Sequence, residues 1–89
     1  MQRPRCYLAE AYTARANAAE LETAAARATA AAATLSGMGR AVRYVRTVFV
    51  PADETSFHFF EAAAVEDVAE TVRRARIECE RIVEANLLP

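Results

Sequence analysis

The chain has 89 residues, two cysteines and a formal net charge of -1. A chain this short makes one domain, spanning residues 1–89, and buries only about 60% of its unfolded surface, so its small core needs support from elsewhere. The charge balance argues against a nucleic-acid partner, and the apolar runs are too short and interrupted to span a membrane. Two cysteines are too few for a disulfide scaffold, and no apolar signal region precedes a cleavage site, so we expect a reducing, cytoplasmic setting.

The first half of the chain predicts a strand followed by a long helix. Residues 5–12, RCYLAEAY, place apolar side chains on both faces when extended, which is typical of a central strand. The alanine-rich segment from Asn17 predicts a helix, because Asn17 can cap its first turn and Glu20 stands three residues later, as in a capping box. Gly37 or Gly39 can end this helix in a left-handed conformation. Its expected buried stripe comprises Ala18, Leu21, Ala25, Ala28, Ala32 and Leu35.

The second half predicts a hairpin, a helix and a last strand. Residues 41–50 are rich in Val, Tyr and Thr, PADE at 51–54 is a turn, and TSFHFFE at 55–61 is the returning strand. Residues 65–76 predict a helix with acidic residues near its positive end and arginines near its negative end. The apolar face of this helix comprises Val65, Val68, Val72 and Ala75. A short strand is expected over about 80–87.

The resulting order, β-α-β-β-α-β, is that of an α+β, ferredoxin-like fold with a four-stranded antiparallel sheet. Both helices cover one face of such a sheet, and the other face is bare in a single chain. Apolar and aromatic residues occupy both faces of the expected strands. We therefore expect the bare face to pack against a second copy, which gives a homodimeric α+β barrel.

Three segments carry a resemblance to a known family: YLAEAY at 7–12, VRYVRTVFVPADETSFHFFEAA at 42–63 and IVEA at 82–85. They resemble a small bacterial ferredoxin-like family of unknown function that includes nickel-binding members. The resemblance covers nearly the whole chain, and the hairpin is its most specific part. The resemblance implies a dimer of the α+β barrel type. The residues alone leave the cofactor unknown, and the resemblance suggests a divalent metal such as nickel.

His58, the one histidine of the chain, has two interpretations. On a strand it shares a face with Ser56 and Phe60, where histidine is usually a hydrogen-bonded structural residue. Alternatively it projects between the two sheets of the dimer, where Glu10 or Tyr12 from the first strand would lie close. A carboxylate beside an imidazole fixes its tautomer and makes it a usable base or metal ligand, so His58 and Glu10 are the candidate metal ligands.

Glu10 stands in the middle of an expected central strand, where a carboxylate is unfavourable unless it is paired. A partner such as Arg43 or Arg46 would make it structural, and otherwise it is a ligand-binding residue. Cys6 on the first strand and Cys79 just before the last strand should fall near one another, because these two strands are expected to be adjacent. Their closeness would permit a disulfide or a two-thiolate metal corner. In a reducing cytoplasm two free buried thiols are the favoured interpretation.

Three functions are compatible with these patterns. The first is a small homodimeric ligand- or metal-binding module with its site between the sheets. The second is a monooxygenase- or isomerase-like enzyme acting on a small organic substrate, with His58 as general base and Tyr44 or Arg46 stabilising negative charge. The third is a purely structural partner with a filled interior. The candidate ligand-binding residues are Glu10, Tyr12, Tyr44, Arg46 and His58.

Overall fold

The computed structural model describes residues 4–88. Its elements confirm the order expected from the sequence. They are β1 (Arg5–Tyr12), α1 (Glu20–Gly37), β2 (Val42–Val50), β3 (Thr55–Ala62), α2 (Val65–Arg74) and β4 (Arg81–Ala85), with single 3-10 turns η1 (Arg15–Asn17) and η2 (Pro51–Asp53). None of the helices within residues 4–88 is both long and apolar enough to cross a membrane.

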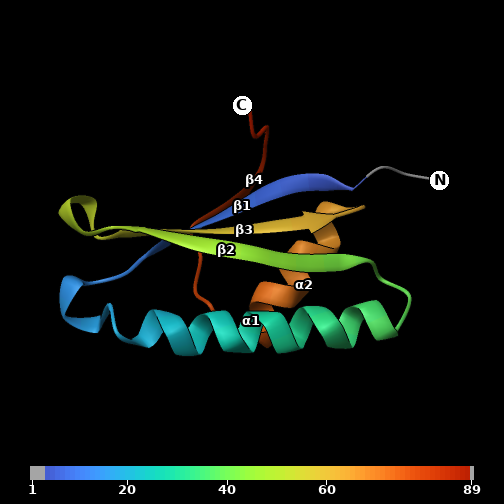
Figure 1. Cartoon of the computed structure of the whole chain (residues 1–89), viewed down its shortest axis with the longest axis horizontal. Coiled ribbons are helices and arrows are strands. Elements are labelled where there is room, and N and C mark those ends of the chain that lie inside the picture. The colour runs from blue at the N-terminus through green and yellow to red at the C-terminus, as the bar shows by residue number, and fades with distance from the viewer. Residues whose placement is uncertain (1–3, 89) are drawn as a thin grey trace.

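The four strands form one antiparallel sheet in the order β2-β3-β1-β4, so β1 and β3 are the central neighbours, as predicted. Both helices lie against the same side of this sheet, and the other side is uncovered (Figure 1). We call these sides the helix face and the open face. The buried residues of the two central strands define the helix face: Tyr7, Ala9, Ala11, Ser56, His58, Phe60 and Ala62. The alternate residues define the open face: Cys6, Leu8, Glu10, Tyr12, Phe57, Phe59 and Glu61.

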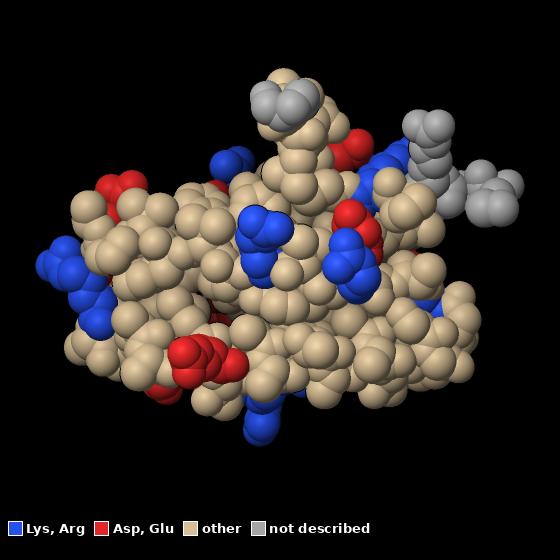
Figure 2. Space-filling view, viewed as in Figure 1, with Lys and Arg blue, Asp and Glu red and all other residues tan. Residues whose placement is uncertain are grey.

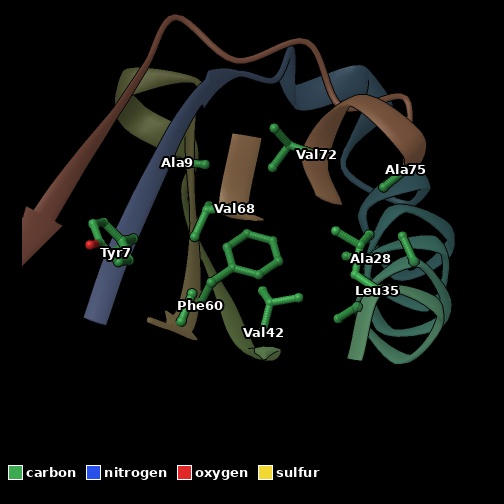
Figure 3. Close-up of a cluster of buried hydrophobic side chains, with 12 residues drawn as sticks. Tyr7, Ala9, Ala28, Leu35, Val42, Phe60, Val68, Val72 and Ala75 are labelled. Atoms are coloured by element: carbon green, nitrogen blue, oxygen red, sulfur yellow. The ribbon is translucent and has the colours of Figure 1, made fainter. Parts of the chain in front are cut away.

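The core lies between the helix face and the two helices (Figure 3). Phe60 is fully buried at its centre, where burial of such a ring contributes about 1.5–3 kcal/mol. Its ring meets that of Tyr44 edge to face, with centroids 5.6 Å apart. Small side chains such as Ala9 and Ala28, both 0% exposed, let α1 approach the sheet closely. A few large side chains and many alanines therefore fill this core.

The N-terminus of α1 differs from the sequence-based prediction. The helix begins at Glu20, and Ala19 precedes it without any side-chain cap. Asn17 is the last residue of η1, and its backbone N–H donates to the carbonyl of Ala14 at 2.8 Å. This extra turn occupies the residues that a capping box would use, so the prediction that Asn17 caps the helix is wrong.

The C-terminus of α1 follows one of the two predicted endings. Gly39 has a φ of 85°, and the N–H of Arg40 donates back to the carbonyl of Leu35 at 3.0 Å. Gly37 remains the last helical residue. The buried face of α1 comprises Ala24, Ala28, Ala31, Ala32 and Leu35, and the predicted stripe contains three of these five: Ala28, Ala32 and Leu35. Val68 and Val72 on α2 and Ala75 directly after it are buried as predicted, whereas Val65 is 37% exposed.

Candidate functional site

His58 lies on the helix face and is 1% exposed. Its partner across the β1–β3 ladder is Ala9, whereas Glu10 is paired with Phe57. Side chains alternate between the faces of a sheet, so His58 and Glu10 point in opposite directions. The expectation that His58 projects from the open face toward Glu10 or Tyr12 is therefore wrong.

A chain of side-chain hydrogen bonds holds the imidazole. Nδ1 of His58 lies 2.8 Å from the hydroxyl of Thr47, which lies 2.6 Å from the hydroxyl of Tyr44. The hydroxyl of Thr47 either donates to Nδ1 or accepts from it, according to the tautomer of the ring. In both arrangements the hydrogen bond to Thr47 on β2 fixes the orientation of the His58 ring.

A β-bulge makes this chain of bonds possible. Tyr44 and Thr47 are three residues apart, a spacing that places side chains on opposite faces of a regular strand. The β2–β3 register shifts between Tyr44 and Arg46, so one extra residue is accommodated there. Tyr44 and Thr47 consequently share the helix face with His58. Thr47 was not a predicted site residue, because the sequence pattern of β2 carries no sign of the bulge.

Burial also sets the charge of the ring. Loss of water around the imidazole lowers the pKa of His58 below its ordinary value of 6.5. His58 is therefore neutral at pH 7. A neutral imidazole can accept or donate a hydrogen bond, but it does not attract anions by charge.

A cleft of about 260 Å³ opens beside His58, between the end of β1, the first turns of α1 and the segment that follows α2. We call it the His58 cleft. Its buried or half-buried floor comprises Ala11, Thr13, Leu21, Ala24, His58 and Ile77. Its charged rim comprises Glu20, Arg27, Arg76 and Glu78. Small polar and apolar groups thus line this cleft, whose volume lies just below the usual range of small-molecule sites.

One side chain on the rim of the cleft and one on its floor already make hydrogen bonds within the protein. Nε of Arg27 donates to the carbonyl of Ala75 at 2.7 Å, which ties α1 to the end of α2. The hydroxyl of Thr13 lies 2.6 Å from that of Ser56, the neighbour of His58 on the same face of β3. These contacts leave His58 and the remaining acceptor capacity of the Thr13 hydroxyl as the polar groups that the floor can offer a ligand. Sequence patterns did not single out Thr13, Arg27 or the rim carboxylates, because three separate segments bring them together.

The other predicted polar residues lie outside this cleft or at its mouth. Glu10 accepts a hydrogen bond from Nε of Arg81 at 2.9 Å, so its partner is neither Arg43 nor Arg46. Arg43 instead pairs with Glu61 at 2.8 Å. Arg46 is exposed and stands opposite Phe59, on the open face. Charges of both signs are dispersed in the view of Figure 2, with one Arg directly against a carboxylate.

Tyr12 is 62% exposed at the end of β1, where its residue borders the His58 cleft. Its backbone N–H donates to a carboxylate oxygen of Glu80 at 3.1 Å. Of the five predicted ligand-binding residues, His58 lines the cleft, Tyr12 borders it from the end of β1, and Tyr44 reaches His58 only through Thr47. Glu10 and Arg46 lie on the open face and do not line the cleft.

The two cysteines are far apart and free, so their predicted adjacency is wrong. Cys6 is paired with Ala85 at one end of β4, whereas Cys79 precedes Arg81, which is paired with Glu10 at the other end. The strand between Cys6 and Glu10 extends about 13 Å, beyond the reach of a disulfide. Burial is the main cause that raises the pKa of both thiols, so both are protonated at neutral pH.

The donor set does not fit a metal ion within one chain. His58 and Glu10 are separated by the sheet, and residues 4–88 contain no group of three His, Cys, Asp or Glu side chains that could hold an ion. One imidazole on an apolar floor supplies too few donors for a divalent cation such as nickel.

Comparisons with known proteins bear on the fold. No family model and no curated protein matches the chain. The crystal structure of SCO4226 from Streptomyces coelicolor A3(2) superposes with a TM-score of 0.73 at 16% sequence identity, covering 94% of this chain and 99% of that one. This likeness confirms the ferredoxin-like α+β arrangement expected from the sequence.

Proposed function

We propose that this protein is a small homodimeric binding module and that its ligand site is the His58 cleft. The observation that carries this proposal is an imidazole held at Nδ1 by Thr47 on the floor of a cleft of about 260 Å³. Such a group is oriented before a ligand arrives, so binding does not have to order it. The site lies beneath the helices and not between two sheets.

The open face supports the homodimer. Apolar side chains occupy all four strands there, and a chain alone leaves them half-buried or exposed: Leu8, Val48, Phe57, Phe59 and Val83. Two ion pairs within the chain, Arg43–Glu61 and Arg81–Glu10, neutralise most of the charge on this face. A second copy could cover it without leaving several unpaired charges buried.

The enzymatic alternative has one favourable observation, which is the neutral, oriented imidazole. For His58 to act as a base, Nε2 must be unprotonated, so Nδ1–H must donate to Thr47. The expected charge stabilisers are not in place, since Thr47 stands between Tyr44 and the ring, and Arg46 is on the open face. Binding without turnover is therefore the better supported function.

Native mass spectrometry of the purified protein tests the binding function. We expect a dimer that carries a defined additional mass. Thr47→Val removes the hydroxyl that is hydrogen-bonded to Nδ1, with little change of shape. This variant should reduce severalfold the fraction of dimer that carries the additional mass. Glu10→Gln is the matched control on the open face and should retain it. Loss of the mass in Glu10→Gln alone would place the ligand between the sheets instead.

A further inference from the structure

The second ring nitrogen of His58 is the group that would meet a ligand. The side-chain hydrogen bonds of residues 4–88 engage His58 through Nδ1. Every buried side-chain nitrogen or oxygen in this part of the chain has a hydrogen-bond partner. Nε2 is therefore not sealed off without a partner, and the cavity that His58 lines, although its ring is only 1% exposed, is the His58 cleft. Nε2 offers one hydrogen bond from a floor that also presents the apolar side chains of Ala11, Leu21 and Ala24.

The charge of the site favours neither anions nor cations. Glu20 and Glu78 on the rim balance Arg27 and Arg76. One N–H of the Arg27 guanidinium, that of Nε, donates to the carbonyl of Ala75 and ties this group to the rim. The ring of His58 is itself neutral at pH 7, because burial lowers its pKa. A ligand with a net charge would be desolvated on entering this cleft without gaining an oppositely charged partner on its floor.

The tautomer decides which chemical group can bind Nε2. When Thr47 donates to Nδ1, Nε2 carries the proton and donates to the ligand; when Nδ1 donates to Thr47, Nε2 accepts. A hydroxyl satisfies both cases, because it can donate or accept. A carbonyl or a protonated amine satisfies only one of them.

Resting on the proposed function, we infer that the His58 cleft takes a small uncharged molecule, about one ring in size, whose hydroxyl bonds Nε2 of His58. The apolar floor formed by Ala11, Leu21 and Ala24 would contact the ring. The cleft volume of about 260 Å³ lies below the roughly 300–1,000 Å³ of sites for drug-sized ligands, so a larger body would protrude past the rim.

Four probes of one-ring size separate the alternatives: phenol, fluorobenzene, benzoate and benzylammonium. The chain has one histidine, so its ring ¹H–¹⁵N signals report on this site without overlap from another imidazole. We expect phenol to shift them saturably and to bind about tenfold more tightly than fluorobenzene, the effect of one hydrogen bond. Both charged probes should bind more weakly than phenol.

Variants of α1 show whether the probe occupies the cleft. Ala24→Leu fills the floor and should abolish the phenol shift, whereas Ala26→Leu, an exposed position on the same helix, should leave it unchanged. Tighter binding of benzoate, benzylammonium or fluorobenzene would overturn the hydroxyl inference and leave the binding function standing. Absence of any shift with all four probes would overturn both. The ranking is measured on the unaltered protein, so it decides the inference even if Ala24→Leu does not fold.

Discussion

At the scale of single residues, His58 links the core to the cleft. Its ring is 1% exposed, and its Nδ1 is held by Thr47. His58 lies two residues before the fully buried Phe60 on the same face of β3. Neutral imidazole is tolerated there, because Thr47 satisfies one nitrogen and the ring borders the His58 cleft. A protonated ring would place a net charge among apolar side chains.

The stability of the fold should depend on the protonation of His58. Burial lowers the pKa of His58 in the folded chain, so between that pKa and 6.5 the unfolded chain binds more protons. The free energy of unfolding should therefore decrease as the pH falls from 7.5 to 5.5, by at most about 1.4 kcal/mol for each pH unit below 6.5. Urea unfolding at the two pH values measures this difference.

His58→Gln is the control for this pH dependence. The chain has no second histidine, so the variant should show a much smaller difference between pH 7.5 and 5.5 than the unaltered protein does. A variant that loses as much stability as the unaltered protein would show that another group titrates. Greater stability at pH 5.5 than at 7.5 would contradict the lowered pKa itself.

At the scale of elements, the two ends of α1 are built differently. Its start depends on the single turn η1 and not on a side-chain cap, whereas its end depends on the left-handed Gly39. Residues with a Cβ are strained at positive φ, and glycine is not. The two glycines near this end therefore have opposite roles, since Gly37 is helical and Gly39 is not.

Alanine substitutions should separate these roles. Gly39→Ala should destabilise the fold by about 1 kcal/mol through backbone strain, and Gly37→Ala should stabilise it by up to about 1 kcal/mol through helix propensity. An added Cβ meets no atom within 4 Å at either position, so steric overlap does not complicate the comparison. Thermal unfolding of both variants measures the effect. Equal shifts of the two melting temperatures in one direction would refute the assignment of Gly39 as the helix stop.

At the scale of the whole molecule, the unequal covering of the sheet is the main feature. Helices cover one face of the sheet (Figure 1). The open face has an apolar centre, with the Arg43–Glu61 and Arg81–Glu10 ion pairs beside it. A domain of 89 residues has little core of its own. A second copy on the open face would add apolar burial that one chain lacks.

Two valines of similar exposure test the homodimer. Val48 is 43% exposed on the open face, and Val65 is 37% exposed at the start of α2. Val48→Glu should weaken the dimer at least tenfold, because its carboxylate would be buried without a partner. Val65→Glu should leave the dimer intact, since an acidic residue suits a helix N-terminus. Sedimentation velocity over a range of concentrations measures both. An unaltered protein that is monomeric throughout would rule out the homodimer.

The sequence by itself determined the kind and order of the elements and the end of α1 at a glycine. These features depend on local signals: side-chain periodicity, helix propensity and the positive φ that glycine allows. Ala28, Ala32, Leu35, Val68 and Val72 were predicted to be buried for the same reason, and they are.

The tertiary structure alone decided how the candidate site is assembled. Which face a strand residue occupies depends on pairing with distant residues and on bulges, so it was not evident that Tyr44 and Thr47 would share a face with His58 while Glu10 would not. The separation of the cysteines and the gathering of the cleft from three segments have the same origin. Local pattern specifies elements, and cross-strand register specifies which side chains meet.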